Sequence, residues 1–476
     1  MKRIRSLAVV VLFATVFGIP AAARAELRAG TAVVDITPEQ WPLAPRGSFT
    51  PRPTDSAHDP LKVRALVLDD GQEDGTSIAL VVVDSCMVHR KLVGGAKQQA
   101  SEATGIAVER MLVCATHTHS APFANAQHGT PEELAYQEKL QSGITEAMVK
   151  ASENLQPARV GWSGHDLPDE VFNRRWFLQP GSVPTNPFGE DTDIVKMNPP
   201  RNNDILINPA GPTDPEVSVL YVENSKGRPL SVFANYSLHY VGRTGGEMSA
   251  DYFGEFARLM PVRLRNCSQD FVPMLSNGTS GDINNINFRN PRPRREPFEQ
   301  IRIVAGKTAD AATRAIQQID PLHQNPTLAM KQREVTLDHR VPTPDQIERA
   351  KNIVEMNDEE AKKLPRLAKA YANRTLELAA EPPTTKVIIQ TLRVGDLAIC
   401  TLPFEVLVEI GLELKKESPA ADTFVVSLAN GGYGYLPTPG QHQFGGYETW
   451  LTTNKVQKDA SEILVTNLLE MLNELF

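Results

Sequence analysis

The sequence LVCATHTHSAP at residues 112–122 joins an apolar run, typical of a strand, to two histidines and a turn. Side chains two residues apart in a strand point to the same side. We therefore expect His117 and His119 to leave the strand end on one face. Two imidazoles aimed together from a buried strand end cost free energy to desolvate unless a metal ion, an anion or a substrate uses them. The alternative is a solvated loop that carries two histidines by chance.

The residues before this stretch predict a strand–helix–strand unit. Residues 77–84 form a very apolar strand of the kind found inside α/β sheets. Residues 88–104 form a helix that Gly105 closes as a C-cap, and residues 111–115 form the next strand. The two histidines then lie beyond the carboxyl end of a strand, where open α/β sheets bind ligands. This pattern predicts an α/β fold with a mixed sheet and flanking helices.

Further polar side chains accompany predicted elements along the chain. His239 follows an apolar strand at residues 229–236, Glu405 opens a helix, and Tyr433 and Tyr435 lie in a glycine–tyrosine loop after a strand at residues 424–428. Nitrogen and oxygen ligands from distant chain positions, with one position left open, are the pattern of a catalytic zinc site. Spacing alone leaves a surface or capped histidine as the alternative for each imidazole.

The N-terminus predicts export. Residues 1–25 combine a basic start, a short apolar run and the sequence Ala-Arg-Ala, which is the pattern of a secretory signal peptide. The apolar run is shorter than the roughly 20 residues that cross a bilayer. We expect a periplasmic or extracellular protein with one domain over residues 26–476. Within it, residues 343–380 predict a charged helical excursion that faces solvent and holds no site.

The composition is that of a globular protein, with 41% hydrophobic and 22% charged residues. The formal net charge of −8 becomes about −12 once the four basic residues of the signal peptide are removed. This acidity argues against nucleic acid or an anionic membrane as a partner. Export is compatible with a disulfide, but the cysteines show no CxxC spacing and their pairing cannot be deduced. They are Cys86, Cys114, Cys267 and Cys400.

Six pieces of the sequence together resemble the neutral (alkaline, non-lysosomal) ceramidases. The sequence ATHTHSAP at residues 115–122 resembles the GTHTHSGP motif of that family. Five other pieces stand in the same order along this sequence as in the family: DITP at 35–38, NR at 173–174, GD at 281–282, FE at 404–405, and YGYLPT at 433–438 with YE at 447–448. The resemblance runs from about residue 28 to 450.

The resemblance implies a neutral ceramidase-like catalytic domain that cleaves a carbon–nitrogen amide bond with zinc-activated water. The four zinc ligands that it implies are His117, His239, Glu405 and Tyr435. It implies His119 as the acid/base histidine beside the metal, and Arg174 and Tyr447 as groups that bind or polarise the scissile carbonyl. Ceramide or another N-acyl lipid is the substrate class that the resemblance favours.

The sequence departs from the family pattern at several positions. Asn284 stands where the family has a serine that has been regarded as a nucleophile, so a covalent mechanism is excluded if Asn284 occupies that place. Ala115 and Ala121 replace two glycines. The sequence ends without the C-terminal immunoglobulin-like domain of ceramidases, which weakens the case for ceramide more than the case for a zinc amidase.

Two alternatives stay open. The same zinc fold could act on a non-lipid amide or ester, such as an N-acyl sugar or a peptide-like amide. The chain could instead be a degenerate family member that binds a ligand without turnover. An apolar cleft long enough for an acyl chain would favour a lipid. The partner is in each case a small molecule or lipid, and the sequence predicts no integral membrane segment.

Overall fold

The computed structural model describes residues 26–47, 52–73, 75–124 and 129–476. The signal peptide expected at residues 1–25 lies outside them. Within the described ranges no helix has the length and apolar character needed to cross a membrane. The fold is built on two large sheets and the helices that cover them. Short strands and 3₁₀ helices lie outside these layers: β6 (Phe172–Asn173), β7 (Arg175–Leu178), β8 (Val195–Met197), β9 (Leu206–Pro209), β13 (Ile283–Asn284), β17 (Glu405–Val406), β19 (Tyr435–Leu436), η1 (Val108–Arg110), η2 (Pro168–Glu170) and η3 (Tyr447–Thr449).

The largest sheet has eight strands in the order β12-β11-β10-β5-β1-β2-β3-β4. Their bounds are β12 (Val272–Asn277), β11 (Pro229–Tyr236), β10 (Glu216–Asn224), β5 (Gln156–Asp166), β1 (Arg28–Asp35), β2 (Lys62–Asp69), β3 (Ser77–Val83) and β4 (Met111–Ala115). Neighbouring strands are antiparallel except for β3 with β4 and β11 with β12, which are parallel. Each parallel pair therefore sends two carboxyl ends to one edge, and these pairs lie at the two ends of the sheet.

A second sheet faces the first across an apolar core. It has the order β14-β15-β16-β18, with β14 (Leu328–Asp338), β15 (Thr384–Val394), β16 (Leu397–Leu402) and β18 (Asp422–Ser427). The core between the sheets includes Leu80 and Phe233 from the first and Ile399 and Phe424 from the second. Burial of these side chains is the main favourable term that holds the two sheets together.

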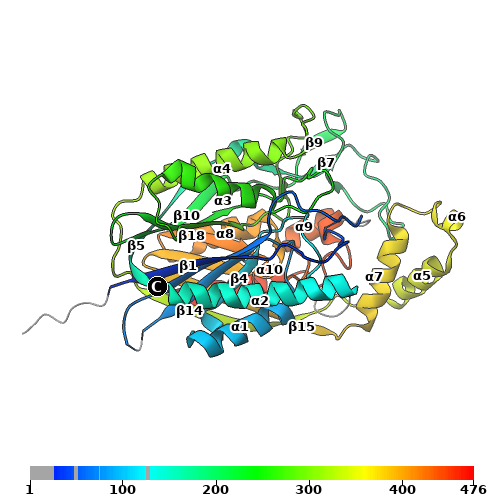
Figure 1. Ribbon diagram of the computed structural model, residues 1–476. Coiled ribbons are helices and arrows are strands. Elements are labelled where there is room, and N and C mark those ends of the chain that lie inside the picture. Colours follow the sequence, from blue (N-terminus) through cyan, green and yellow to red (C-terminus); the bar gives the residue numbers. More distant parts are fainter. Residues whose placement is uncertain (1–25, 48–51, 74, 125–128) are drawn as a thin grey trace, which may run out of the picture.

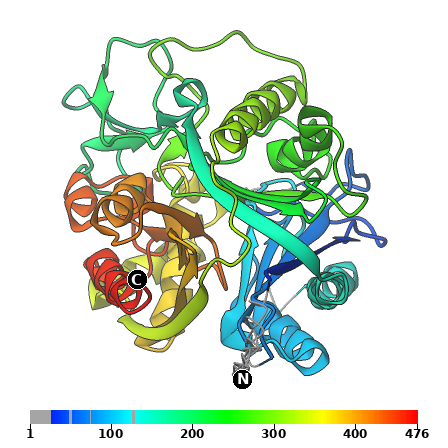
Figure 2. The same cartoon turned by 90° about the vertical axis from the view of Figure 1, so that its left-hand side faces the viewer.

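Helices cover both outer faces, so the molecule has four layers (Figures 1 and 2). Successive side chains along a strand point to opposite faces of the sheet, so each strand contributes apolar side chains to two cores. In β3, Leu80 and Val82 point to the core between the sheets, whereas Val81 and Val83 pack under helices. The covering helices of the first sheet are α1 (Arg90–Thr104), α2 (Pro131–Glu153), α3 (Asp251–Leu264) and α4 (Glu299–Gln317), and those of the second are α8 (Val408–Glu417) and α10 (Ala460–Asn473). The prediction of a mixed α/β fold with flanking helices is confirmed.

Local sequence signals set the ends of these helices. Gly105 closes α1 in the left-handed conformation, as predicted from the sequence. Thr130 and Glu133 form a capping box at the start of α2, in which each side chain accepts from the other residue's backbone N–H. All four cysteines are free thiols. The fold therefore depends on packing and not on disulfides.

Three helices stand apart from the layers at one end of the molecule (Figure 1). They are α5 (Pro344–Glu355), α6 (Asp358–Ala361) and α7 (Ala368–Ala380). The short helix α9 (Pro439–Phe444) is not one of them and comes later in the sequence. These three helices occupy the predicted excursion at residues 343–380. The division of the whole chain into a signal peptide and one domain stays a prediction.

Candidate active site

The two histidines of the opening stretch do converge, but not by strand alternation. Strand β4 ends at Ala115, and His117 has a φ of 70°, a left-handed conformation that is uncommon outside glycine. Backbone N–H groups of Thr116 and His117 donate to the carbonyl oxygens of Val83 and Ser85 at 2.9 Å each. The chain after β4 is thus held against the chain after β3, and Nε2 of His117 lies 3.2 Å from Nε2 of His119.

Backbone carbonyls fix the orientation of two imidazoles. Nδ1 of His117 donates to the carbonyl oxygen of Cys86 at 2.8 Å, and Nδ1 of His239 donates to that of Ser280 at 3.1 Å. Each Nε2 is left with a free lone pair, and the two Nε2 atoms lie 3.1 Å apart. Histidines that ligate a metal are commonly oriented by such a hydrogen bond at the other ring nitrogen.

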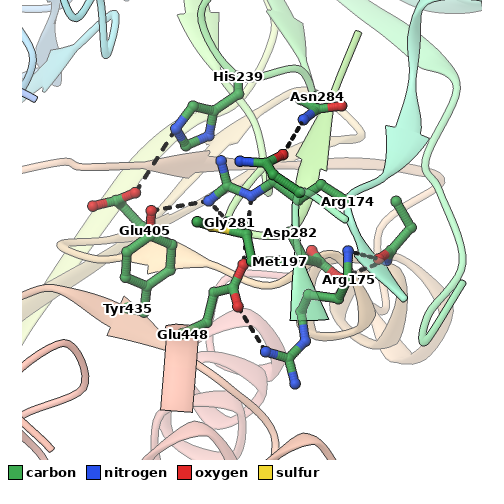
Figure 3. A network of polar contacts seen from close by, with 12 residues as sticks. Arg174, Arg175, Met197, His239, Gly281, Asp282, Asn284, Glu405, Tyr435 and Glu448 are labelled. Atoms are coloured by element: carbon green, nitrogen blue, oxygen red, sulfur yellow. Dashed lines mark hydrogen bonds and ion pairs between the residues drawn. The ribbon is translucent and has the colours of Figure 1, made fainter. Parts of the chain in front are cut away.

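Glu405 and Tyr435 are paired by the backbone. Strand β17 runs parallel to β19, and Glu405 lies opposite Tyr435 in the register. Oε2 of Glu405 is 3.2 Å from Nε2 of His117 and 3.9 Å from Nε2 of His239. The Tyr435 hydroxyl hydrogen-bonds the Glu405 carboxylate and accepts from Nη2 of Arg174 at 2.9 Å. Figure 3 shows His239, Glu405, Tyr435 and Arg174 close to one another.

The sequence prediction that Glu405 opens a helix is wrong. Glu405 lies in β17, and α8 begins three residues later at Val408. The backbone N–H of Val408 donates to Oδ1 of Asp282 at 2.9 Å, so a buried carboxylate satisfies the helix start. Residues 405 and 406 form a strand and not the first turn of the helix because they pair with β19. That partner lies thirty residues away, so the local sequence pattern does not reveal it.

The donor set fits a zinc ion. One ligand atom each from His117, His239 and Glu405 lies within 4.8 Å of the others, and all three residues are buried. Tetrahedral zinc with bonds of about 2.0–2.1 Å separates its ligand atoms by about 3.3 Å. The observed separations are 3.1, 3.2 and 3.9 Å. Oε2 of Glu405 is buried without a hydrogen-bond donor, which is an acceptor that a cation would satisfy.

The electrostatics of the cluster also favour one positive charge next to Glu405. Burial disfavours charge on His117, yet Cys86 and Glu405 outweigh it and raise the pKa of His117 to about 10. Burial likewise raises the pKa of Glu405, but His117 and the hydrogen bond from Tyr435 leave it below its usual value. A carboxylate that stays ionised in a buried site needs a proton on its neighbour or a metal ion.

His119 is held as a neutral imidazole beside this cluster. Its ring stacks on Tyr240, with centroids 3.8 Å apart and planes at 18°. Burial, followed by the charges of His117 and Arg174, holds the pKa of His119 well below its usual value. A neutral imidazole at this place can accept a proton.

Arg174 and Tyr447 are placed differently from one another. Nη2 of Arg174 donates to the carbonyl oxygen of Gly281 at 2.7 Å as well as to Tyr435, and the residue is 5% exposed. Tyr447 lines the cleft that reaches the cluster, and its ring lies 5.5 Å from that of Tyr435. The contact of either residue with a substrate carbonyl stays a prediction.

A buried ion pair supports the site and was missed in the sequence. Nη1 of Arg175 donates to Oε2 of Glu448 at 2.7 Å, and neither side chain is exposed. Glu448 Oε1 also lies 3.5 Å from Nε of Arg174. Figure 3 shows this ion pair. Arg175 follows Arg174 in the sequence and Glu448 follows Tyr447. These two neighbouring positions were the sequence signals that could have pointed to the pair.

Asn284 lies near the site with its polar groups in use (Figure 3). Its Nδ2 donates to Oδ1 of Asn198 at 2.8 Å, and its Oδ1 accepts from the backbone N–H of Ile286 at 2.9 Å. An amide that is hydrogen-bonded at both ends is a structural contact of β13. Its place in any mechanism stays a prediction.

A cleft of about 910 Å³ leads to the cluster. His117, His119, Glu405 and Tyr435 line it. Arg374 and Glu377 of α7 also line it, so the excursion that was expected to hold no site forms part of this wall. Sequence pattern alone could not place α7 here, because its charged residues are those of an ordinary solvent-facing helix.

Fold and site together define a four-layer α/β domain with a candidate metal centre at a cleft. Two neutral ceramidases are similar to it in sequence. The chain is 24% identical over 279 residues to neutral ceramidase A of Dictyostelium discoideum and 23% identical over 245 residues to neutral ceramidase B of that organism. These matches cover 55% and 48% of this chain but only 36% and 31% of the relatives. No family model matches the chain.

Solved structures agree in fold over nearly the whole chain. The crystal structure of neutral ceramidase from Pseudomonas aeruginosa superposes with a TM-score of 0.72 at 17% identity, covering 95% of this chain and 74% of that one. A ceramidase complexed with C2 gives 0.71 at 17% identity, covering 95% and 76%. The chain has a neutral ceramidase-like domain.

Proposed function

We propose that this protein is an exported, zinc-dependent amidohydrolase that cleaves a carbon–nitrogen amide bond. The observation that carries the proposal is the cluster of His117, His239 and Glu405, whose three ligand atoms converge at a cleft. Similarity to neutral ceramidases supports amide hydrolysis as the reaction. Export rests on the sequence of residues 1–25.

His117, His239, Glu405 and Tyr435 would hold the zinc ion. When bound, zinc lowers the pKa of a water molecule to about 7 and polarises a carbonyl group. Arg174 has a positioning role in this scheme, because its hydrogen bond to the Tyr435 hydroxyl keeps that oxygen next to Glu405. Burial and the Glu405 carboxylate raise the pKa of the Tyr435 hydroxyl well above its usual value, and the Arg174 guanidinium opposes that shift.

His119 moves the proton. As a neutral imidazole, it accepts a proton from the attacking water while the carbon–oxygen bond forms. It returns that proton to the nitrogen as the carbon–nitrogen bond breaks, which gives a carboxylic acid and an amine. Tyr447, which lines the cleft, donates a hydrogen bond to the carbonyl oxygen as negative charge develops there. Asn284 takes no part, since an amide is not a nucleophile.

The test is hydrolysis by the purified full chain, with zinc bound, of ceramide, N-acyl amino acids and N-acetyl sugars. We expect release of an amine from at least one class and loss of turnover when a chelator removes the metal. A protein that binds zinc and one of these compounds without cleaving any would instead be a ligand-binding member of the fold. A protein that binds no zinc would refute the proposed site.

A further inference from the structure

Arg46 is a cation at the mouth of the site with no anionic partner among the described residues. Its guanidinium carbon lies 4.8 Å from the centroid of the Phe123 ring, and its Nη2 lies 3.7 Å from Sδ of Met87, which is only a weak acceptor. The other arginines and lysines of the cleft have partners: Arg90 pairs with Glu334, Lys455 pairs with Glu381, and Arg374 lies over the Tyr371 ring. Arg46 therefore keeps its donors available.

The backbone places Arg46 beside His119. The N–H of Arg46 donates to the carbonyl oxygen of Ala121 at 2.9 Å, which ties this loop to the chain just after the two histidines. Gly47 follows with a φ of 111°, and a Cβ there would lie 2.3 Å from Nδ1 of His119. The loop backbone thus packs directly on the imidazole, and its arginine enters the same cleft.

The remaining wall of the cleft is not that of an acyl-chain tunnel. Among the described residues that line it, the side chains made only of hydrocarbon or thioether are Met87, Phe123, Pro382 and Val456. The others carry charged, hydroxyl, imidazole or thiol groups, or are glycines. An apolar cleft was the feature expected for a lipid with long chains, and this wall offers little such surface.

We propose that Arg46 binds a carboxylate on the amine half of the substrate, so that the site selects N-acyl amino acids over ceramide. The proposal rests on the amidohydrolase function above. His119 protonates the leaving nitrogen in that reaction, so groups bonded to the nitrogen lie on the His119 side of the cleft, where Arg46 lies. In an N-acyl amino acid the carboxylate is one carbon from that nitrogen, and a guanidinium binds a carboxylate through two parallel hydrogen bonds.

The test compares N-acetylglycine with N-acetylglycinamide, which carry a carboxylate and a neutral carboxamide at the same place in the amine half. With the zinc-loaded full chain we expect kcat/KM to be about 10- to 100-fold higher for the carboxylate, the range for a hydrogen bond to a charged group. In Arg46→Met this ratio should fall to near 1. Arg46→Lys keeps the positive charge but lacks the planar guanidinium that forms two parallel hydrogen bonds, so it should give an intermediate ratio.

Lys455→Met is the matched control, because Lys455 also lines the cleft but is paired with Glu381. It should keep the ratio of the unaltered protein. Hydrolysis of both compounds at equal rates, preference for ceramide, or a preference that survives in Arg46→Met would overturn this inference while leaving the amidohydrolase standing. Zinc-loaded protein that cleaves no amide would refute the proposed function itself, and this inference with it.

Discussion

The buried lysine of α1 provides a sharp test of how the loop before Tyr435 is held. Lys97 is 3% exposed, and its ammonium group donates to Oδ1 of Asn430, whose Nδ2 donates to Oε1 of Gln390 at 2.8 Å. Asn430 begins the glycine-rich loop that leads to Tyr435. Burial lowers the pKa of Lys97 to about 7. The change Lys97→Met keeps the unbranched shape and removes the titrating group.

The magnitude follows from the two pKa values. Between pH 7 and 10.5 the unfolded chain holds a proton on Lys97 that the folded protein has released, so stability rises with pH in this window. The penalty for burying the lysine is fully present below pH 7 and absent above 10.5. A pKa difference of about 3.5 corresponds to about 5 kcal/mol, or about 1.4 kcal/mol for each pH unit.

The assay is guanidinium denaturation of the metal-free protein at pH 7, 8 and 9. The free energy of unfolding of Lys97→Met relative to the unaltered protein should fall by about 1.4 kcal/mol for each pH unit. The unpaired oxygen of Asn430 adds a cost of about 1–3 kcal/mol that does not vary with pH. Lys351→Met, on an exposed face of α5, should follow the unaltered protein. A constant difference between Lys97→Met and the unaltered protein would refute the reasoning, because Lys97 would then titrate alike in both states.

Three further predictions concern the site. Elemental analysis should find that His117→Ala loses zinc and turnover together, whereas His119→Ala keeps most of its zinc and loses turnover; equal zinc loss in both would contradict their separate roles. Asn284→Ala should retain turnover within about threefold, and a folded but inactive variant would show that Asn284 is no bystander. Glu448→Gln leaves the Arg175 guanidinium buried without its counter-charge and should lower the free energy of unfolding by about 3–5 kcal/mol, measured by denaturation; an unchanged value would mean that the pair adds nothing.

Parts of the fold that depend on short-range pattern could be predicted from the sequence. The apolar run of β3, the helix of α1 and its Gly105 cap are set by residues close in the chain, and the structure has them within two residues of the predicted ends. The grouping of His117 with His239 was expected from the resemblance to the neutral ceramidases and not from strand pattern, since β4 runs opposite to β11 in the sheet.

Features that depend on distant partners could not be predicted. The left-handed conformation of His117 is imposed by its hydrogen bond to Ser85, and the strand conformation of Glu405 by pairing with Tyr435. Arg46 lies in a proline-rich segment that local pattern describes only as a loop. Its position beside His119 comes from a hydrogen bond to Ala121, seventy-five residues away in the loop after β4.

The proposed ligands belong to two different sheets. His117 and His239 follow strands of the eight-stranded sheet, whereas Glu405 and Tyr435 follow β16 and β18 of the other. A cation held by all four would act as a cross-link between the sheets, and its binding would add about 2.7 kcal/mol of stability at a hundredfold excess over the dissociation constant. Because more than a hundred residues separate successive histidine and glutamate ligands, the site can assemble only after the sheets have docked. Metal entry would then be a late event in folding, and metal supply would set how far the docked state is stabilised.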